Sequence, residues 1–425
     1  MYLHDIAHSS TTTSEAAIGT QNVATLSPAW KLSVKNVIAA APTVVNGVLY
    51  VGDWAGNFYA VDANAGNILW QEFVGISADP DQPWCMPATG VSSQATVIGD
   101  TVYVGGGDSA VYAFDTKSGY RRWRVPIAKP TTGAYLWSSV VPSGNSIYIG
   151  IASLADCPLT RGGLVRMDLS DPTNPVTRYL TPENTQGAGV WSTPAIDPAT
   201  NTVFITTGTG DQDPDSELWG STFMSVDATT LTTKSYYLLP SYDPGADIEW
   251  GSSPTLIQTA DGQRLVAATA KDGVLYALNQ DDLSVGWTLR LAVSCVCPEC
   301  GCGSLSTPAY DGKLLYVGAG VADPEGFDNG SVYAINPSNG TVVWMRSLAD
   351  TVLAPVTVAN GVLFVSTLTG LQVYDAASGD ALWNDGMGGA LYSQPVVTNG
   401  TVYLTYVGGD IVAFKPSSKS QSSSF

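Results

Sequence analysis

Short runs of alternating hydrophobic and polar residues, separated by turn residues, make up most of this chain. Residues 41–70 show the pattern once: Ala-Pro-Thr-Val-Val, an Asn-Gly turn, Val-Leu-Tyr-Val-Gly, Asn-Phe-Tyr-Ala-Val-Asp, a turn at Gly66, and a last run with Trp70. Alternation with a period of two is typical of β-strands, and Asn-Gly favours the tight turn of a hairpin. The segment therefore predicts four short strands joined by tight turns.

This four-strand pattern recurs along the whole chain and can be counted eight times. The third strand of each copy ends at a comparable polar residue: Asp62, Asp115, Asp168, Asp227, Asn279, Asn336, Asp375 and Lys415. The eighth copy lacks a fourth strand, whereas residues 26–34 resemble a fourth strand, with Trp30, that has nothing before it. Four-stranded repeats without helical segments predict a β-propeller. We expect an all-β, eight-bladed propeller whose ring is closed by the N-terminal strand, which removes a free sheet edge.

The repeat also predicts how the chain is divided. Its 425 residues would otherwise suggest two or three domains. We expect one propeller domain at 26–416, a lead-in segment at 1–25, and a Ser-rich, disordered tail at 417–425. A pair of β-sandwiches is the alternative, but it would not explain a terminal strand that completes the last repeat. Longer connections in the earlier copies predict loops on a functional face.

Charge and composition exclude several classes of function. Acidic residues outnumber basic ones 37 to 18, and a net charge of −19 argues against a nucleic-acid partner. The chain is 44% hydrophobic and 13% charged, which argues against disorder. No run approaches 18 apolar residues, so no membrane span is predicted. The two histidines, His4 and His8, lie at the N-terminus, so nucleophilic catalysis by a Ser/His or Cys/His pair is not indicated.

Four cysteines form a tight cluster at Cys295, Cys297, Cys300 and Cys302. A zinc site of four thiolates is one interpretation. We favour nested disulfides, Cys297–Cys300 and Cys295–Cys302, in an oxidising compartment. A c-type haem needs Cys-x-x-Cys-His, and Gly301 follows Cys300, so no haem attachment is expected.

The two other cysteines, Cys85 and Cys157, fall in loops of neighbouring copies, and we expect them to pair. An even number of cysteines and an acidic surface together favour a periplasmic or extracellular location.

The motif Ala-x-Asp-x-x-x-Gly-x-x-x-Trp, seen at Ala60, Asp62, Gly66 and Trp70, resembles the tryptophan-docking repeat of eight-bladed alcohol dehydrogenases that use pyrroloquinoline quinone (PQQ). The resemblance covers nearly the whole chain and is closest in style to polyvinyl-alcohol dehydrogenase-like proteins without the haem domain. Outer-membrane assembly scaffolds share the repeat, so function has to be argued from the site.

The resemblance implies a metal site built from carboxylates of copies three to five. Asp156 follows Ser-Leu-Ala and matches a metal-binding Glu of the family. Asp211 stands where the family's Gly-x-Gly-Asn motif has a metal-binding Asn. Asp247, in Asp-Ile-Glu-Trp-Gly, matches the catalytic base and a ligand, and Glu249 matches a second carboxylate of some relatives. Ca²⁺ or a lanthanide ion would suit such oxygen donors.

The resemblance also implies three contacts to PQQ. Ser153 matches a residue that touches the quinone, Trp191 the aromatic floor under its ring, and Lys271 a cation at its oxygens. Two features of the family are absent, since Val91-Ser92-Ser93 stands where it has an Arg and Ile38-Ala39-Ala40 where it has a Glu. Cys85-Met86 replaces its adjacent cysteines.

The implied activity is oxidation of a small-molecule or polymeric alcohol by hydride transfer to PQQ, with Asp247 as general base. The electrons would pass to an external acceptor, a cytochrome or a quinone. The rival hypothesis is a non-enzymatic propeller that acts as a binding or assembly scaffold. The carboxylate set separates the two, because a scaffold has no reason to retain it. A third possibility, an enzyme of another class on this fold, is less favoured.

Overall fold

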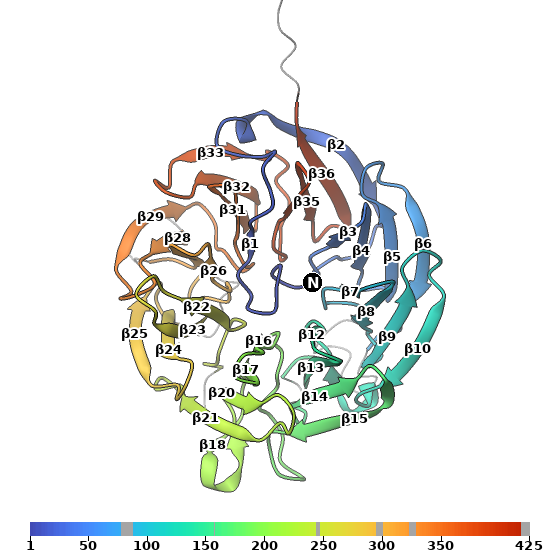
Figure 1. Cartoon of the computed structure of the whole chain (residues 1–425), viewed down its shortest axis with the longest axis vertical. Helices are drawn as coiled ribbons and strands as arrows, with labels where there is room; N and C mark the ends of the chain where they lie inside the picture. The colour runs from blue at the N-terminus through green and yellow to red at the C-terminus, as the bar shows by residue number, and fades with distance from the viewer. Residues whose placement is uncertain (78–87, 157, 244–246, 295–300, 323–328, 418–425) are drawn as a thin grey trace, which may run out of the picture.

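Eight antiparallel sheets are arranged in a ring around a central opening (Figure 1). The computed structural model describes all residues except 78–87, 157, 244–246, 295–300, 323–328 and 418–425. Each blade has four strands, and its first strand lies nearest the centre of the ring. The predicted all-β, eight-bladed propeller is confirmed.

The first four blades consist of consecutive strands, with additions in blades three and four. Blades one and two are β3 (Thr43–Val45), β4 (Val48–Gly52), β5 (Asn57–Asp62), β6 (Ile68–Phe73), and β7 (Thr96–Ile98), β8 (Thr101–Gly105), β9 (Ala110–Asp115), β10 (Arg121–Pro126). Blade three is β12 (Val141–Ser143), β13 (Ser146–Ser153), β14 (Gly163–Asp168) and β15 (Asp171–Tyr179), with β11 (Ala134–Tyr135) added to β13. Blade four is β16 (Ala195–Asp197), β17 (Thr202–Thr206), β20 (Thr222–Asp227) and β21 (Thr233–Leu238). A hairpin of β18 (Gln212–Asp213) and β19 (Leu218–Trp219) is inserted into it.

The last four blades have fewer additions. Blades five and six are β22 (Thr255–Gln258), β23 (Arg264–Thr269), β24 (Val274–Asn279), β25 (Val285–Arg290), and β26 (Ala309–Tyr310), β27 (Leu315–Ala319), β28 (Gly330–Ile335), β29 (Val342–Leu348). Blade seven is β30 (Thr357–Ala359), β31 (Val362–Thr367), β32 (Gly370–Asp375) and β33 (Ala381–Asn384). Blade eight is β34 (Val396–Thr398), β35 (Thr401–Thr405) and β36 (Asp410–Pro416), completed by β2 (Leu26–Ser33).

The ring is closed by pairing between its two ends, as predicted. β2 runs antiparallel to β36, with Trp30 opposite Ala413 and Ser33 opposite Asp410. Without β2, β36 would be an open edge of blade eight, so this pairing removes a free sheet edge.

Each docking tryptophan joins its blade to the next one. The indole N–H of Trp30 donates to the Ala63 carbonyl at 3.0 Å, and that of Trp70 donates to a carbonyl in blade two at 3.1 Å. Gly66 has a φ of +74°, and a Cβ there would lie 2.7 Å from the Trp30 ring. Gly119 faces Trp70 in the same way. The Gly and Trp of the repeat are therefore one contact between neighbouring blades.

The N-terminal segment crosses one end of the central opening (Figure 1). The carbonyls of four of its residues accept hydrogen bonds from the innermost strands of blades four, five, six and seven in turn: Ile6 from Ile196 (2.7 Å), Ala7 from Leu256 (2.8 Å), Ser9 from Tyr310 (2.8 Å) and Ser10 from Val358 (3.0 Å). β1 (Thr11–Thr12) then pairs in parallel with β30, and Glu15 accepts from the Gly400 N–H of blade eight at 2.9 Å. The lead-in segment thus ties five blades together.

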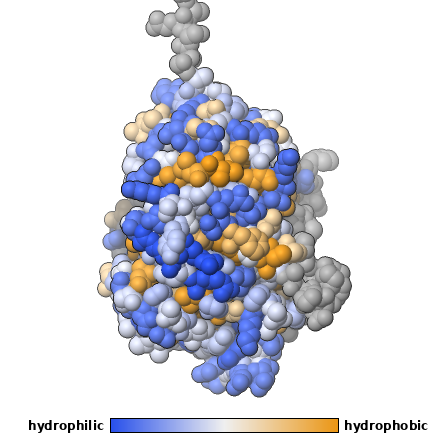
Figure 2. Space-filling model, turned by 90° about the vertical axis from the view of Figure 1, so that its right-hand side faces the viewer, coloured by the Kyte–Doolittle hydropathy of each residue, from blue (hydrophilic) through white to orange (hydrophobic). Residues whose placement is uncertain are grey.

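The outer strands form the rim of the ring. On the side that carries β6 and β10, apolar areas lie among hydrophilic ones (Figure 2). Ile68, Leu69 and Phe73 of β6 are among the exposed apolar side chains of the rim. The described part of the chain contains no helix with the length and apolar character to cross a membrane.

Candidate functional site

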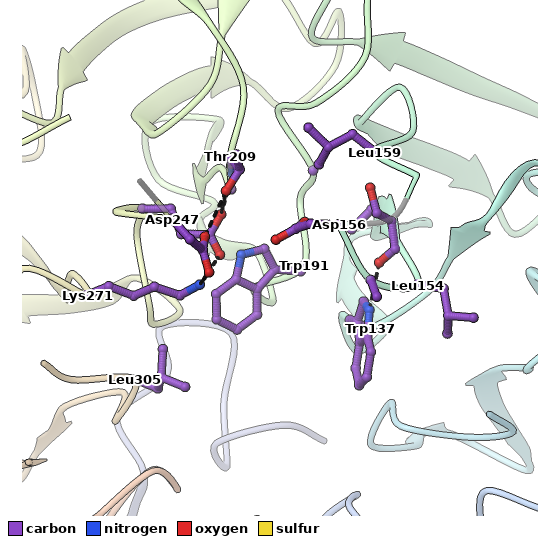
Figure 3. Close-up of a pocket in the computed structure, with 15 residues that line it drawn as sticks. Trp137, Leu154, Asp156, Leu159, Trp191, Thr209, Asp247, Lys271 and Leu305 are labelled. Atoms are coloured by element: carbon purple, nitrogen blue, oxygen red, sulfur yellow. Dashed lines mark hydrogen bonds and ion pairs between the residues drawn. The ribbon is translucent and has the colours of Figure 1, made fainter. Parts of the chain in front are cut away.

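Loops of blades three to five border a cavity of about 420 Å³ (Figure 3). Six of the seven predicted site residues line it: Ser153, Asp156, Trp191, Asp247, Glu249 and Lys271. They come from segments that either end a second strand or precede a first strand. Equivalent ends of neighbouring blades meet at one face of the ring, so residues almost 120 positions apart in sequence share one cavity.

Backbone hydrogen bonds hold these segments in place. Val190 N–H donates to the Ile151 carbonyl at 2.9 Å, which fixes Trp191 beside the end of β13. The Lys271 N–H donates to the Glu249 carbonyl, also at 2.9 Å. The side chains of Glu249 and Lys271 therefore start from adjacent, hydrogen-bonded backbone segments. Little additional ordering of the chain is needed to form their ion pair.

One cation is shared by two carboxylates at the centre of the site. Lys271 Nζ lies 2.6 Å from Asp247 Oδ2 and 2.9 Å from Glu249 Oε1. The Thr209 hydroxyl is 2.9 Å from both Asp247 Oδ1 and Glu249 Oε2, and the Thr209 N–H donates to Glu249. Figure 3 shows Thr209, Asp247 and Lys271 on one wall of the cavity. Thr209 holds the two carboxylates in a fixed relation to each other.

Burial and the neighbouring charges move the pKa values of this group. Burial raises the pKa of Glu249, and Asp247 and Asp156 raise it further against the opposing effect of Lys271. Burial also raises the pKa of Asp156, with a further contribution from Asp247. Burial acts to lower the pKa of Lys271, but Glu249 and Asp247 outweigh it and the pKa is raised. The ammonium ion therefore stays charged at neutral pH.

The two paired carboxylates differ in access to the cavity. The Asp247 side chain is 37% exposed, whereas that of Glu249 is 8% exposed. A molecule in the cavity would therefore reach Asp247 more readily, while Glu249 is held by its partners.

Beside these charges, the indole of Trp191 lies next to the backbone of Gly208, which has no side chain. Trp191 lies between Lys271 and Asp156 in Figure 3. A Cβ at Gly208 would lie 3.0 Å from Trp191 Cδ1 and 2.6 Å from Glu249 Oε2. Any larger residue than glycine would thus intrude on the floor of the cavity. This combination leaves room for a flat group against the indole.

The opposite wall is apolar. Trp137, Leu154 and Leu159 line it (Figure 3), and the Trp137 indole N–H donates to the Ser153 carbonyl at 2.9 Å. The Ser153 hydroxyl oxygen accepts from the Thr160 N–H at 2.8 Å, so the Ser153 side chain is oriented by the backbone of the same loop.

Asp211, the seventh predicted residue, does not line the cavity. The chain turns at Gly210, where φ is +154°, and enters the β18–β19 hairpin. The Gly220 N–H donates to the Asp211 carbonyl at 3.0 Å, and the Asp211 carboxylate lies 3.5 Å from the Tyr242 hydroxyl. Asp211 therefore stands directly before the inserted hairpin and not among the residues that line the cavity, and its role as a metal ligand stays a prediction.

Two residues of the cavity were missed in the sequence. Thr209 lies two positions before Asp211 and takes the place beside the carboxylates that we expected for Asp211. Trp137 precedes Ser-Ser as Trp191 precedes Ser-Thr, four residues before the innermost strand of its own blade. Alignment of the inner strands of blades three and four would have found Trp137.

Among the residues that the structure describes, no three His, Cys, Asp or Glu side chains form a group that could hold a metal ion. The Lys271 ammonium group instead provides the positive charge next to Asp247 and Glu249. The predicted disulfides involve Cys85, Cys157, Cys295, Cys297 and Cys300, which lie outside the described residues. Cys302 is disulfide-bonded. The pairings stay predictions.

The fold and the cavity define a repeat propeller with an acidic, aromatic-floored cavity on one face. A protein-family model described as outer membrane protein assembly factor BamB matches residues 11–156 and 183–421. The chain therefore belongs to this family of propellers.

Individual relatives agree with the predicted resemblance. The chain is 26% identical over 312 residues to a putative dehydrogenase XoxF of Paracoccus denitrificans, covering 62% of this chain and 50% of the relative. It is 21% identical over 430 residues to a polyvinylalcohol dehydrogenase of Pseudomonas sp., covering 85% and 66%. A europium-containing methanol dehydrogenase superposes with a TM-score of 0.82 at 14% identity, covering 98% of this chain and 97% of that structure.

These comparisons establish the fold and the family of the chain, but they do not establish its activity. The chain spans between half and two thirds of the length of these curated relatives, and the solved structure shares only the fold at this identity. The family description names an assembly factor, and curated relatives of both kinds match: the two above are named dehydrogenases, and one of Yersinia pestis, 27% identical over 197 residues, is named outer membrane protein assembly factor BamB. The activity must therefore be argued from the cavity.

Proposed function

We propose that the protein is a PQQ-dependent alcohol dehydrogenase that binds its cofactor in the cavity over Trp191 together with Ca²⁺ or a lanthanide ion. The observation that carries this proposal is that Asp156, Asp247 and Glu249 line the same cavity as the open aromatic face of Trp191. An assembly scaffold has no need of an acidic group whose charges are partly buried, because burying them costs free energy. The names of the relatives support the same class of reaction.

The residues present fit such a cofactor in three respects. The missing Cβ at Gly208 leaves the face of Trp191 open to a flat ring. Lys271 offers a cation to the oxygens of a quinone. Asp156 and Glu249 offer hard oxygen donors, and the ammonium group now beside Glu249 marks a place that favours positive charge.

When bound, PQQ would supply the two-electron acceptor and the cation a Lewis acid. Asp247 would take the proton of the substrate hydroxyl at Oδ1 or Oδ2, because it is the more accessible carboxylate. Through its hydroxyl group, Thr209 would hold the carboxylates of Asp247 and Glu249 in a fixed relative position during this transfer. The apolar lining residues Leu154, Leu159 and Leu305 would receive the hydrocarbon part of an alcohol and exclude water.

We place the protein in the periplasm or outside the cell, where it would pass electrons to an external cytochrome or quinone. The substrate would be a small or polymeric alcohol. Before the cofactor binds, the ion pairs with Lys271 would balance the negative charge of Asp247 and Glu249.

The test is reconstitution of the full chain with PQQ and either Ca²⁺ or La³⁺, followed by alcohol-dependent reduction of a dye. We expect turnover in the native protein and its loss in Asp247→Asn. Asp211→Asn is the matched control: it makes the same change in charge outside the cavity and should keep turnover. If the native protein neither binds PQQ, measured by its absorbance, nor reduces the dye, the enzyme proposal fails and the scaffold alternative stands.

A further inference from the structure

A second cavity, of about 440 Å³, lies on the axis of the ring. Its lining includes residues of all eight blades and Tyr2 of the N-terminal segment. Trp137, Trp191 and Leu305 line both this cavity and the candidate site, so the two cavities are neighbours. The second cavity will be called the central chamber. No step of the reaction proposed above uses it.

The repeat supplies one residue of each blade to the wall of the central chamber. The position four residues before each innermost strand lines the chamber in all eight blades. In five blades this position holds a large apolar or aromatic side chain that is not fully buried: Trp137, Trp191, Leu305, Leu353 and Tyr392. A wall of this kind binds apolar molecules, and its indole and phenol rings favour a flat one.

The central chamber differs from the candidate site in charge. Among the described residues that line the chamber, none is Asp, Glu, Lys, Arg or His. The candidate site, in contrast, contains Asp156, Asp247, Glu249 and Lys271. An ion in the chamber would lose its hydration and gain no charged partner, which is unfavourable. The chamber therefore suits a neutral, apolar ligand.

The shared tryptophans place such a ligand close to the proposed reaction. A flat group over Trp191 in the candidate site and a ring in the chamber would both contact this indole. After each alcohol is oxidised, two electrons have to leave the candidate site. The rate of electron transfer falls steeply with distance, so an acceptor that touches the same side chain as the donor is well placed. A cytochrome is too large to enter a cavity of 440 Å³, whereas a small molecule fits.

We propose that the central chamber binds the electron acceptor, a small neutral quinone whose ring lies against Trp137 and Trp191. The acceptor role rests on the function proposed above, because the electrons come from the alcohol oxidised in the candidate site. The alcohol loses two electrons and two protons and becomes an aldehyde or a ketone. The quinone gains two electrons from the candidate site and two protons from water and becomes a hydroquinone, while the protons of the alcohol leave to water through Asp247 and the candidate site.

The first test measures binding to the full chain without PQQ. Menadione and 1,4-naphthoquinone-2-sulfonate have the same rings, and a sulfonate replaces the methyl group in the second. Binding is followed by isothermal titration calorimetry and by quenching of tryptophan fluorescence. We expect menadione to bind and the sulfonate to bind at least tenfold more weakly, because the chamber offers no charged partner. Equal affinities, or no binding of menadione, would overturn the proposal.

Three variants locate the bound menadione. Leu353 lines the chamber and not the candidate site, whereas Leu159 lines the candidate site and not the chamber. Leu353→Trp should abolish binding, and Leu159→Trp should leave it unchanged; the reverse pattern would overturn the proposal. Tyr392 is 43% exposed, and Tyr392→Ser should weaken binding about fivefold through the loss of one aromatic contact. This last variant decides if circular dichroism shows that Leu353→Trp does not fold.

The second test separates the acceptor site from the proposed function. The full chain is reconstituted with PQQ and Ca²⁺, and the alcohol-dependent reduction of ferricyanide and of menadione is measured separately. Ferricyanide carries three negative charges and is excluded from the chamber. We expect Leu353→Trp to keep the reduction of ferricyanide and to lose at least nine tenths of the reduction of menadione.

Each remaining outcome has one meaning. If ferricyanide is reduced but menadione is not, the acceptor site is wrong, the proposed function stands, and a cytochrome is the acceptor. If Leu353→Trp lowers both reductions equally, menadione reacts in the candidate site and the proposal is overturned. If the native protein reduces neither acceptor, the proposed function fails and the acceptor role of the chamber falls with it.

Discussion

The buried His8 makes the stability of the ring depend on pH. Its Nδ1 donates to the Pro254 carbonyl at 2.8 Å, its ring meets Tyr2 edge to face at 5.2 Å, and its Nε2 has no partner among the described residues. Burial lowers the pKa of His8 from 6.5 to about 4, although the Pro254 carbonyl and Asp5 oppose this change. The neutral imidazole is therefore the form that the folded protein holds.

The direction of the effect follows from proton binding. Because the folded pKa is lowered, the unfolded chain binds more protons than the folded one between about pH 4 and 6.5. Stability is therefore complete above the unfolded pKa and is lost as the pH falls through it. At pH 5 the loss is about 2 kcal/mol, since one pKa unit corresponds to about 1.4 kcal/mol. With an unfolding entropy of about 2.1 cal/mol/K per residue, Tm would fall by about 2 °C.

The measurement is Tm at pH 8 and at pH 5 for the native protein and for His8→Phe. Phenylalanine keeps an aromatic ring beside Tyr2 and cannot titrate, while the carboxylates of the chain contribute equally to both proteins. We expect the native protein to lose about 2 °C more than the variant between the two pH values. The loss of the Pro254 hydrogen bond lowers Tm in the variant at both pH values and cancels. An equal decrease in both proteins would refute the assignment of His8 as a buried neutral base.

Three substitutions test other contacts of the ring and the site. Lys271→Met should raise the affinity for Tb³⁺ more than tenfold, measured by its luminescence, because the ammonium group no longer competes for the carboxylates; unchanged affinity would contradict this. Gly208→Ala should weaken PQQ binding at least tenfold in an absorbance titration with little change in Tm, since the added Cβ meets the cavity floor. Gly66→Ala should lower Tm by a few degrees, because it combines a φ of +74° with a clash against Trp30. Gly47→Ala, with a φ of +78° and open space around it, is the control and should cost less; equal losses would exclude the Trp30 contact.

The ring could be predicted from the sequence because each blade repeats the residues that join it to the next. Gly66 and Trp30 are 36 positions apart and touch across the closure of the ring, yet both are visible as members of the same repeat. A pattern that recurs eight times fixes the number of blades and the position of the closing strand. The same repetition places Ser153 and Lys271 at equivalent ends of their second strands, which brought them into one cavity.

Sequence reasoning failed where the chain departs from the repeat. Within the described part of the chain, the hairpin inserted after Gly210 has no counterpart in another blade, so the sequence did not show that Asp211 stands at the start of an insertion. The N-terminal segment was equally hidden, because Ile6 and Ala7 bind neighbouring blades through their carbonyls. Backbone hydrogen bonds need no particular side chain, and a segment that uses them carries no motif.

Departures from the repeat are also what create the two cavities. The position four residues before the innermost strand holds Trp191 in blade four, Gly251 in blade five and Ala39 in blade one. Eight large side chains at this position would fill the central opening, and eight small ones would leave it without a partition. The mixture places an indole at part of the opening, so that Trp191 lines both the candidate site and the second cavity, of about 440 Å³, in the central opening. Substitutions at this single position in different blades would therefore change the cavities separately, while the Gly and Trp contacts that close the ring would be unaffected.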